Sequence, residues 1–203
     1  MNPEYRQEEV LSARELQEKY KKLKEELLKD INSLTQPLGH GTVSEHLEDI
    51  LVHGLGEKVP ANAYAGTKSA VDLTKPDGLL GAYLFSRWNT EDLAVHNPNN
   101  LLEEYTELNP AITKERLEEA FQTYKQKRQP EGYPVVLIYD GNDEITVVGT
   151  NPNIPSELTF SEPIPTNTLK YVLVPEVRKK EVEAMIEKHQ INITILPVEM
   201  LET

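Results

Sequence analysis

Apolar residues recur at intervals of three and four over residues 3–34, which is the spacing of one face of an α-helix. Lysine and glutamate fill the opposite face, and the apolar positions are Leu16, Tyr20, Leu23, Leu27, Ile31 and Leu34. Ser12 and Glu15 have the spacing of a capping box, so the helix begins at Ser12 or runs continuously from Pro3. A stripe of this length must be covered, and we expect it to pack along the main domain rather than on a partner.

A second helix is predicted after the stretch His-Gly-Thr at 40–42. Thr42 and Glu45 again have capping-box spacing, and apolar residues follow at helical intervals at Val43, Leu47, Ile50 and Leu51. Gly54 lies where a left-handed cap would end the helix, and Leu55 follows as its hydrophobic contact. A histidine and a bare backbone amide before a helix N-terminus favour a polar or anionic small molecule. An ordinary strand-to-helix turn would have the same features.

The remaining pattern predicts short strands and helices. Residues 56–80 have little apolar content and several prolines and glycines, which predicts an irregular loop. Strands are expected at 79–86, 135–139, 145–148, 157–160, 169–174 and 191–196, and helices at 100–108, 113–127 and 177–189. The turn at 140–143 predicts that the strands beside it form a hairpin. The fold class is therefore α+β, with helices mostly early and an antiparallel sheet mostly late.

Composition narrows the function. The 203 residues carry a formal charge of −13, which argues against broad nucleic-acid binding. Cysteine is absent, and the five histidines lack metal-ligand spacing, so we expect no metal site. Neither a signal peptide nor an apolar run of membrane-spanning length is visible, so we expect no membrane association. The expected location is the cytoplasm, or another cell's cytoplasm after delivery without a cleaved signal peptide.

Three stretches in order resemble the histidine–tyrosine–glutamate class of ADP-ribosyltransferases, the branch of diphtheria toxin and poly(ADP-ribose) polymerase. They are His40-Gly41-Thr42 with its helix and Gly54-Leu55, then Gly81-Ala82-Tyr83-Leu84 followed by Ser86, then Glu157 before Ile164-Pro165. The resemblance covers roughly residues 36–200. It implies an antiparallel split sheet flanked by helices in a catalytic domain at 36–203, with the N-terminal amphipathic helix at 1–35 as an addition.

The resemblance also implies a role for each residue. His40 would hydrogen-bond a ribose hydroxyl of the co-substrate NAD, and Gly41 would offer its backbone N–H and C=O to the nicotinamide carboxamide. Tyr83 would stack on the nicotinamide ring. Glu157 would be catalytic and bind the 2′-hydroxyl of the nicotinamide ribose. Thr42 would add a ribose contact and Ser86 would line the same wall as Tyr83.

The implied reaction is transfer of ADP-ribose from NAD to a protein acceptor with release of nicotinamide, or to water. A bacterial toxin or effector would be one setting for it. Glu144, Glu162 and Glu176 are rivals for the catalytic carboxylate. Pro155, two residues before Glu157, does not support arginine modification by the motif of the arginine-specific class.

Two other functions remain open. A catalytically degenerate transferase fold would bind a nucleotide or a protein, and the lack of a tyrosine about eleven residues after Tyr83 favours it. A related RNA 2′-phosphotransferase also has an H-G-T-like block, but it needs arginines to grip RNA phosphates. The arginines here are few and scattered, so this function ranks below the other two.

Overall fold

The chain was analysed as a computed structural model, which describes residues 11–57, 68–88, 98–110, 113–116, 119, 132–141, 145–151 and 154–203. Its centre is a seven-stranded sheet in the order β4-β5-β2-β1-β3-β6-β7. The strands are β1 (Pro37–Val43), β2 (Ser69–Asp72), β3 (Pro134–Asp140), β4 (Val147–Asn151), β5 (Ile154–Phe160), β6 (Leu169–Val174) and β7 (Thr194–Pro197). Neighbouring strands are antiparallel except β6 and β7, which run parallel. The α+β class is confirmed.

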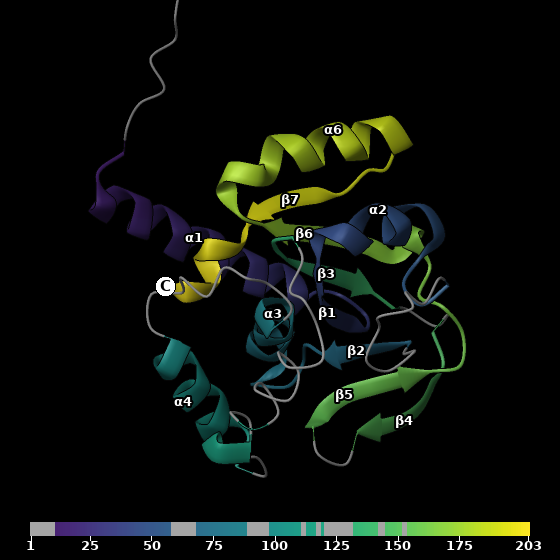
Figure 1. Cartoon of the computed structure of the whole chain (residues 1–203), viewed down its shortest axis with the longest axis horizontal. Helices are drawn as coiled ribbons and strands as arrows, with labels where there is room; N and C mark the ends of the chain where they lie inside the picture. The colour runs from purple at the N-terminus through teal and green to yellow at the C-terminus, as the bar shows by residue number, and fades with distance from the viewer. Residues whose placement is uncertain are drawn as a thin grey trace, which may run out of the picture.

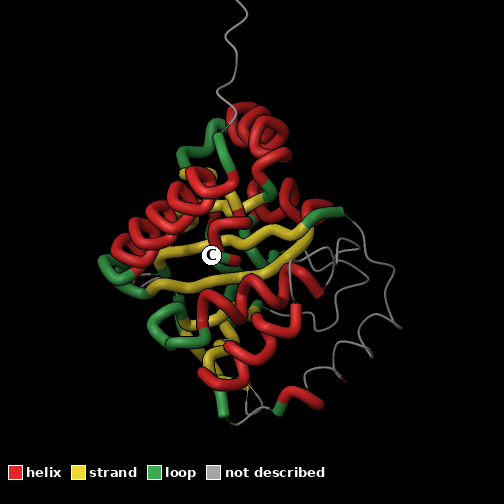
Figure 2. The backbone as a smooth tube through the Cα atoms, turned by 90° about the vertical axis from the view of Figure 1, so that its left-hand side faces the viewer, coloured by secondary structure: helices red, strands yellow, loops and turns green. Residues whose placement is uncertain are grey.

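Helices cover both faces of the sheet (Figures 1 and 2). The face with α1 (Ala13–Ile31), α3 (Gly78–Trp88) and α4 (Pro98–Leu108), called here the α3 face, also carries the short helix η4 (Val198–Glu202). The opposite face, called the α2 face, carries α2 (Ser44–His53) and α6 (Lys179–His189). Two further short helices, η2 (Thr166–Thr168) and η3 (Glu176–Arg178), flank β6.

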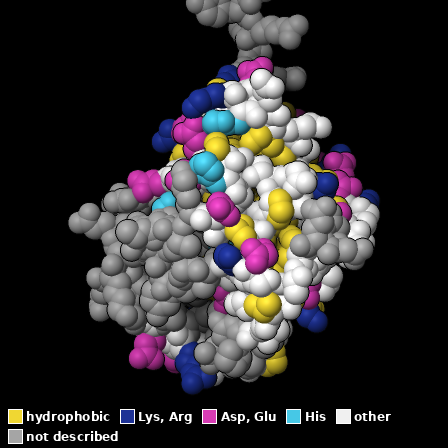
Figure 3. All heavy atoms as spheres, turned by 90° about the vertical axis from the view of Figure 1, so that its right-hand side faces the viewer, with side chains coloured by type: hydrophobic (Ala, Val, Ile, Leu, Met, Phe, Trp, Pro, Cys, Tyr) yellow, Lys and Arg dark blue, Asp and Glu magenta, His cyan; other side chains and the backbone are white. Residues whose placement is uncertain are grey.

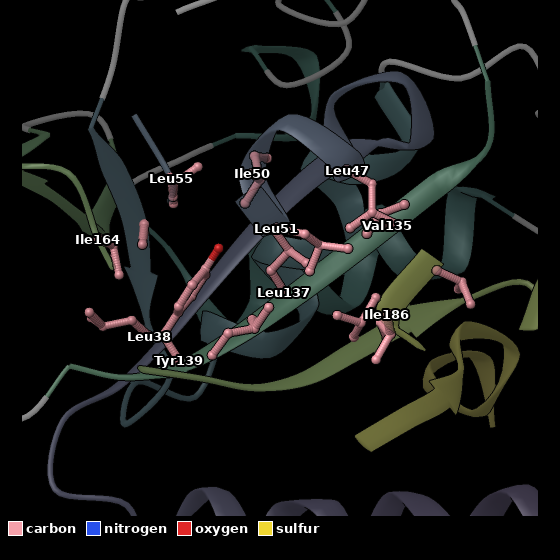
Figure 4. Close-up of a cluster of buried hydrophobic side chains, with 14 of the residues drawn as sticks. Leu38, Leu47, Ile50, Leu51, Leu55, Val135, Leu137, Tyr139, Ile164 and Ile186 are labelled. Atoms are coloured by element: carbon pink, nitrogen blue, oxygen red, sulfur yellow. The ribbon is translucent and has the colours of Figure 1, made fainter. Parts of the chain in front are cut away.

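Strand β3 shows why the sheet has two cores. Alternate residues of a strand point to opposite faces. Val136 and Ile138 belong to the core of the α3 face, and Val135, Leu137 and Tyr139 to the core of the α2 face. Figure 4 shows the second core, where apolar side chains of α2 meet those of β3. A continuous apolar run is therefore what a central strand covered on both faces requires.

Helix α1 begins where its capping box predicts. The Ser12 side chain accepts from the Glu15 N–H, and the Glu15 carboxylate accepts from the Ser12 N–H at 2.8 Å. Tyr20, Leu27 and Ile31 are buried in the core of the α3 face. The expected packing of this helix on the main domain is confirmed, so α1 shares a core with the sheet rather than lying apart from it.

A charged contact joins α2 to α6 on the other face. The Glu48 carboxylate accepts from the Lys188 ammonium at 2.6 Å and contacts the His189 ring at 2.9 Å. These partners lower the pKa of Glu48 to about 2. Figure 3 shows histidine side chains gathered beside acidic and basic ones on this side of the molecule.

Several predictions about local structure are wrong. Residues 79–86 were expected to form a strand and belong to helix α3, and the predicted loop at 56–80 contains β2. The hairpin between 135–139 and 145–148 does not form, because β3 pairs with β1 and β6 whereas β4 pairs with β5. Thr42 does not cap α2: it lies within β1, and Val43 occupies the cap position without a side-chain bond.

Other predictions hold or fall outside the described residues. The helix at 100–108 and the strands at 157–160 and 169–174 are confirmed, and the helix at 177–189 begins at Lys179. Gly54 ends α2 with a positive φ of 89°, which favours glycine, but its ψ of 163° is not that of the predicted left-handed cap. Most of the helix predicted at 113–127 lies outside the described residues. Within the ranges that the structure describes, no helix has the length and apolar character needed to cross a membrane.

Candidate functional site

His40 lies in the central strand β1, with its ring turned toward β2. Its Nδ1 lies 2.9 Å from the Ser69 carbonyl oxygen. A carbonyl can only accept a hydrogen bond, so Nδ1 carries the proton. The pKa of His40 is lowered to about 4, chiefly by burial and to a smaller extent by the nearby His46, while the bond to the Ser69 carbonyl opposes the shift. The ring is therefore neutral near pH 7, with Nε2 as a hydrogen-bond acceptor.

The backbone groups of β1 point alternately to its two neighbours. The Pro37 carbonyl accepts from Leu73 N–H on the β2 side at 3.0 Å, and the Gln36 carbonyl accepts from Gly141 N–H on the β3 side at 2.8 Å. Because this alternation repeats every two residues, the N–H and C=O of the odd-numbered residues of β1 face β2. Gly41 is one of these residues.

The ladder between β1 and β2 stops before it reaches Gly41. Its last pair is Gly39 with Val71, and the next hydrogen-bonded pair would join Gly41 to Ser69. The Ser69 carbonyl accepts from the His40 ring instead. The N–H and C=O of Gly41 therefore face the space between β1 and β2 beyond the end of the ladder, beside the His40 ring. This space is called here the Gly41 interval.

Helix α3 lies directly against Gly41. A Cβ built on this glycine would lie 2.5 Å from the Ser86 nitrogen, closer still to the Ala82 carbonyl oxygen, and 3.0 Å from the Phe85 Cβ. Close packing of α3 thus requires a glycine here, independently of any ligand. Phe85 is half-buried, and its Cβ lies beside Gly41. The sequence interpretation missed this residue, because only its place next to Ser86 and three residues after Ala82 on the same helix connects it with β1.

Three predicted site residues are buried. Tyr83 is fully buried in the core of the α3 face, and its hydroxyl donates to the Glu202 carboxylate. The Arg87 guanidinium lies 5.5 Å from the centre of the Tyr83 ring. Ser86 is also fully buried and donates to the Tyr83 carbonyl at 2.6 Å. Thr42 is buried in β1. The prediction that Tyr83 lies in a strand is wrong, because it belongs to α3, which directs this side chain into the core beside η4.

Glu157 lies in β5, directly opposite Val71 of β2, and is half-buried. Residues directly opposite each other share a face of the sheet, and Val71 belongs to the α3 face. His40 lies opposite Leu137, which belongs to the α2 face. His40 and Glu157 thus lie on opposite faces of the sheet. The structure brings His40, Gly41 and Ser69 together and places Glu157 two strands from β1, roughly 10 Å away at the usual strand spacing.

The rival glutamates lie elsewhere. Glu162 is exposed beyond the end of β5. The backbone N–H of Glu176 donates to both carboxylate oxygens of Glu199 at 3.1 Å, at the far end of β6. Glu144 is outside the described residues. Among the three candidates that the structure describes, Glu157 is consequently the carboxylate closest in the sheet to the Gly41 interval.

The described residues contain no group of three or more histidine or acidic side chains arranged to hold a metal ion. Comparison with known proteins finds no protein-family model, no curated protein and no solved structure that matches this chain. We therefore infer function from the geometry at His40, Gly41 and Glu157.

Proposed function

We propose that the chain binds NAD at the Gly41 interval and transfers ADP-ribose to a protein acceptor, releasing nicotinamide. The observation that carries this proposal is the end of the β1–β2 ladder. It leaves one N–H donor and one C=O acceptor of Gly41 directed to the same side. A primary carboxamide has the complementary pair, an acceptor oxygen and a donor nitrogen. The nicotinamide end of NAD carries this group.

The protonation of His40 fits a hydroxyl-rich ligand. Nδ1–H is committed to the Ser69 carbonyl, so the neutral ring offers Nε2 as an acceptor. A ribose hydroxyl can donate to it. The protonated ring would have no acceptor, and the low pKa of His40 keeps the neutral form across the physiological range.

Glu157 supplies the negative charge that the reaction needs. Breaking the bond between nicotinamide and ribose moves its electron pair to the ring nitrogen, and positive charge develops on the sugar, as in glycoside hydrolysis. A carboxylate near that sugar stabilises the transition state more than the ground state. The acceptor nucleophile then bonds to the anomeric carbon and loses its proton. No metal or covalent protein nucleophile is needed for these steps.

The first test is nicotinamide release from NAD by the purified protein, by Glu157→Gln, and by the control Glu162→Gln. Glu162 is an exposed carboxylate five residues further along the chain, so its loss changes the net charge equally. We expect Glu157→Gln to lower the rate about 10²–10³-fold, the usual effect of removing one electrostatic group, and Glu162→Gln to leave it unchanged. Equal rates in all three proteins would move the catalytic role away from Glu157.

A binding module without catalysis is the second candidate, and the burial of Tyr83 in the core favours it. Binding and cleavage are separated by measuring the dissociation constant for NAD by calorimetry alongside the release assay. Binding that is weakened by His40→Ala, with no nicotinamide release from the unmodified protein, would support the binding module. Absence of both binding and release would refute the NAD site itself.

A further inference from the structure

A buried polar cluster lies at the start of β5, immediately before Glu157. The Asp77 carboxylate oxygen Oδ2 accepts from the Ser156 hydroxyl at 2.8 Å and from the Asn109 side-chain amide at 3.2 Å. All three residues are at least nine-tenths buried, with exposed fractions of 6% for Asp77, 2% for Ser156 and 6% for Asn109. Tyr105, 1% exposed, packs beside them.

The cluster joins α3, α4 and β5 to the chain that leaves the end of β2. Asp77 immediately precedes α3, Asn109 immediately follows α4, and Ser156 belongs to β5. Asp77 is five residues beyond the last residue of β2, so its bond to Ser156 connects β5 with the chain that leaves β2. Buried polar groups are costly unless they are paired, and the two donors and one carboxylate here satisfy one another.

The position of this bond in the ladder matters for Glu157. Val71 opposite Glu157 is the last pair between β2 and β5. The Ser156–Asp77 bond lies at this end of the pairing and ties the side chain of the residue before Glu157 to the segment that leaves β2. The Glu157 charge also affects the cluster. The pKa of Tyr105 is raised to about 12, chiefly by burial, then by the Asp77 charge, and to a lesser extent by the Glu157 charge.

We propose that Asp77, through its hydrogen bond to Ser156, is a positioning residue that fixes the start of β5 and with it the Glu157 carboxylate. The inference rests on the proposed function, in which Glu157 acts on the transition state. Neither Asp77 nor Ser156 needs to touch NAD. Since a displacement of about 1 Å can cost roughly 10²-fold in rate, we expect Ser156→Ala to lower kcat about 10- to 100-fold with KM unchanged.

The test is a double-mutant cycle on nicotinamide release with Ser156→Ala, Glu157→Gln and the pair. If Ser156 acts through Glu157, adding Ser156→Ala to Glu157→Gln lowers kcat no further. Thr168→Ala is the matched control, because Thr168 is a buried hydroxyl bonded to the Pro165 carbonyl at 2.7 Å far from β5. Its kcat should stay within about twofold of the unmodified protein. Asp77→Asn, which keeps the side-chain size, replaces Ser156→Ala if that variant does not fold.

A kcat for Ser156→Ala within about twofold of the unmodified protein would overturn the inference and leave the proposed function standing. The same conclusion would follow if Ser156→Ala lowered kcat equally in the unmodified protein and in Glu157→Gln. An inactive unmodified protein would instead refute the proposed function. In that case amide hydrogen exchange still tests whether the Asp77–Ser156 bond holds Glu157 in place. Faster exchange at Glu157 in Ser156→Ala, with β6 unchanged, supports it, and unchanged exchange at Glu157 overturns it.

Discussion

Replacing Gly41 by alanine should destabilise the protein strongly, whatever ligand it binds. The added Cβ would lie 2.5 Å from the Ser86 nitrogen, against about 3.4 Å for ordinary contact, and closer still to the Ala82 carbonyl oxygen. Both obstacles are backbone atoms of α3, which cannot rotate away. Strand β1 and helix α3 would have to separate by about 1 Å, the difference between ordinary contact at about 3.4 Å and the 2.5 Å to the Ser86 nitrogen.

That separation would loosen the core of the α3 face, where Ala82 and Tyr83 are fully buried. Overpacking of this kind costs about 1–3 kcal/mol, and contact with fixed backbone atoms places Gly41→Ala at the upper end. The lower entropy of the unfolded alanine chain offsets about 0.4–1 kcal/mol of that cost. We therefore expect a net loss of about 2–3 kcal/mol, or a fall in Tm of roughly 5–10 °C at 2–4 °C per kcal/mol for a chain of this size.

Urea unfolding of Gly41→Ala and Gly149→Ala measures this loss. Among the described residues, the one neighbour within reach of a Cβ added at Gly149 in β4 is the Thr159 hydroxyl oxygen at 3.0 Å, a side-chain atom that can rotate. Gly149→Ala should therefore stay within about 1 kcal/mol of the unmodified protein. A free energy of unfolding for Gly41→Ala within about 0.5 kcal/mol of the unmodified protein would refute the packing of α3 against β1.

Two further predictions concern His40 and Tyr83. Because the pKa of His40 is about 4 in the folded protein and 6.5 ordinarily, the unfolded chain binds more protons between these values. The His40 contribution to stability is therefore fully present above pH 6.5 and falls as the pH is lowered toward 4; urea unfolding should show a smaller fall in His40→Asn. Tyr83→Phe removes the hydroxyl bonded to Glu202 and should cost about 1–2 kcal/mol. Its dissociation constant for NAD should not change, whereas weaker binding would return this side chain to the site.

The elements that local signals specify are the ones that the sequence predicts well. The capping box at Ser12 marks the start of α1, and the helical spacing of Val182 and Ile186 marks α6. The short strands β5 and β6 also follow from their composition. In each case the deciding contacts lie within one element or one face of it, where side-chain periodicity is informative.

The predictions that failed depend on contacts between distant parts of the chain. Residues 79–86 are apolar almost throughout because α3 lies between the sheet, α1 and α4, and a short run buried on every side has no period that distinguishes helix from strand. The hairpin failed for a related reason. Strand β3 is covered on both faces and paired on both edges, so its neighbours in space are β1 and β6 rather than the next strand in sequence.

The candidate site was predictable only in part. The sequence identifies His40 and Gly41, since a histidine and a glycine before a helix are unusual, but it cannot show that the β1–β2 ladder ends beside them. The partner of His40 is a backbone carbonyl, at Ser69, and any residue supplies a carbonyl. The position of Phe85 beside Gly41 likewise depends on how closely α3 approaches β1.

The short pairing between β1 and β2 explains why the candidate site lies where it does. Strand β2 has only four residues and pairs over two of them with β1 and three with β5. Side-chain bonds lie near both ladder ends, from His40 to Ser69 on one side and from Ser156 to Asp77 on the other. The first lies beside the proposed NAD site at Gly41, and the second lies beside Glu157, which we propose it positions. Extending the β1–β2 pairing to Gly41 and Ser69 would close the Gly41 interval, so the proposed NAD site depends on the early end of this pairing.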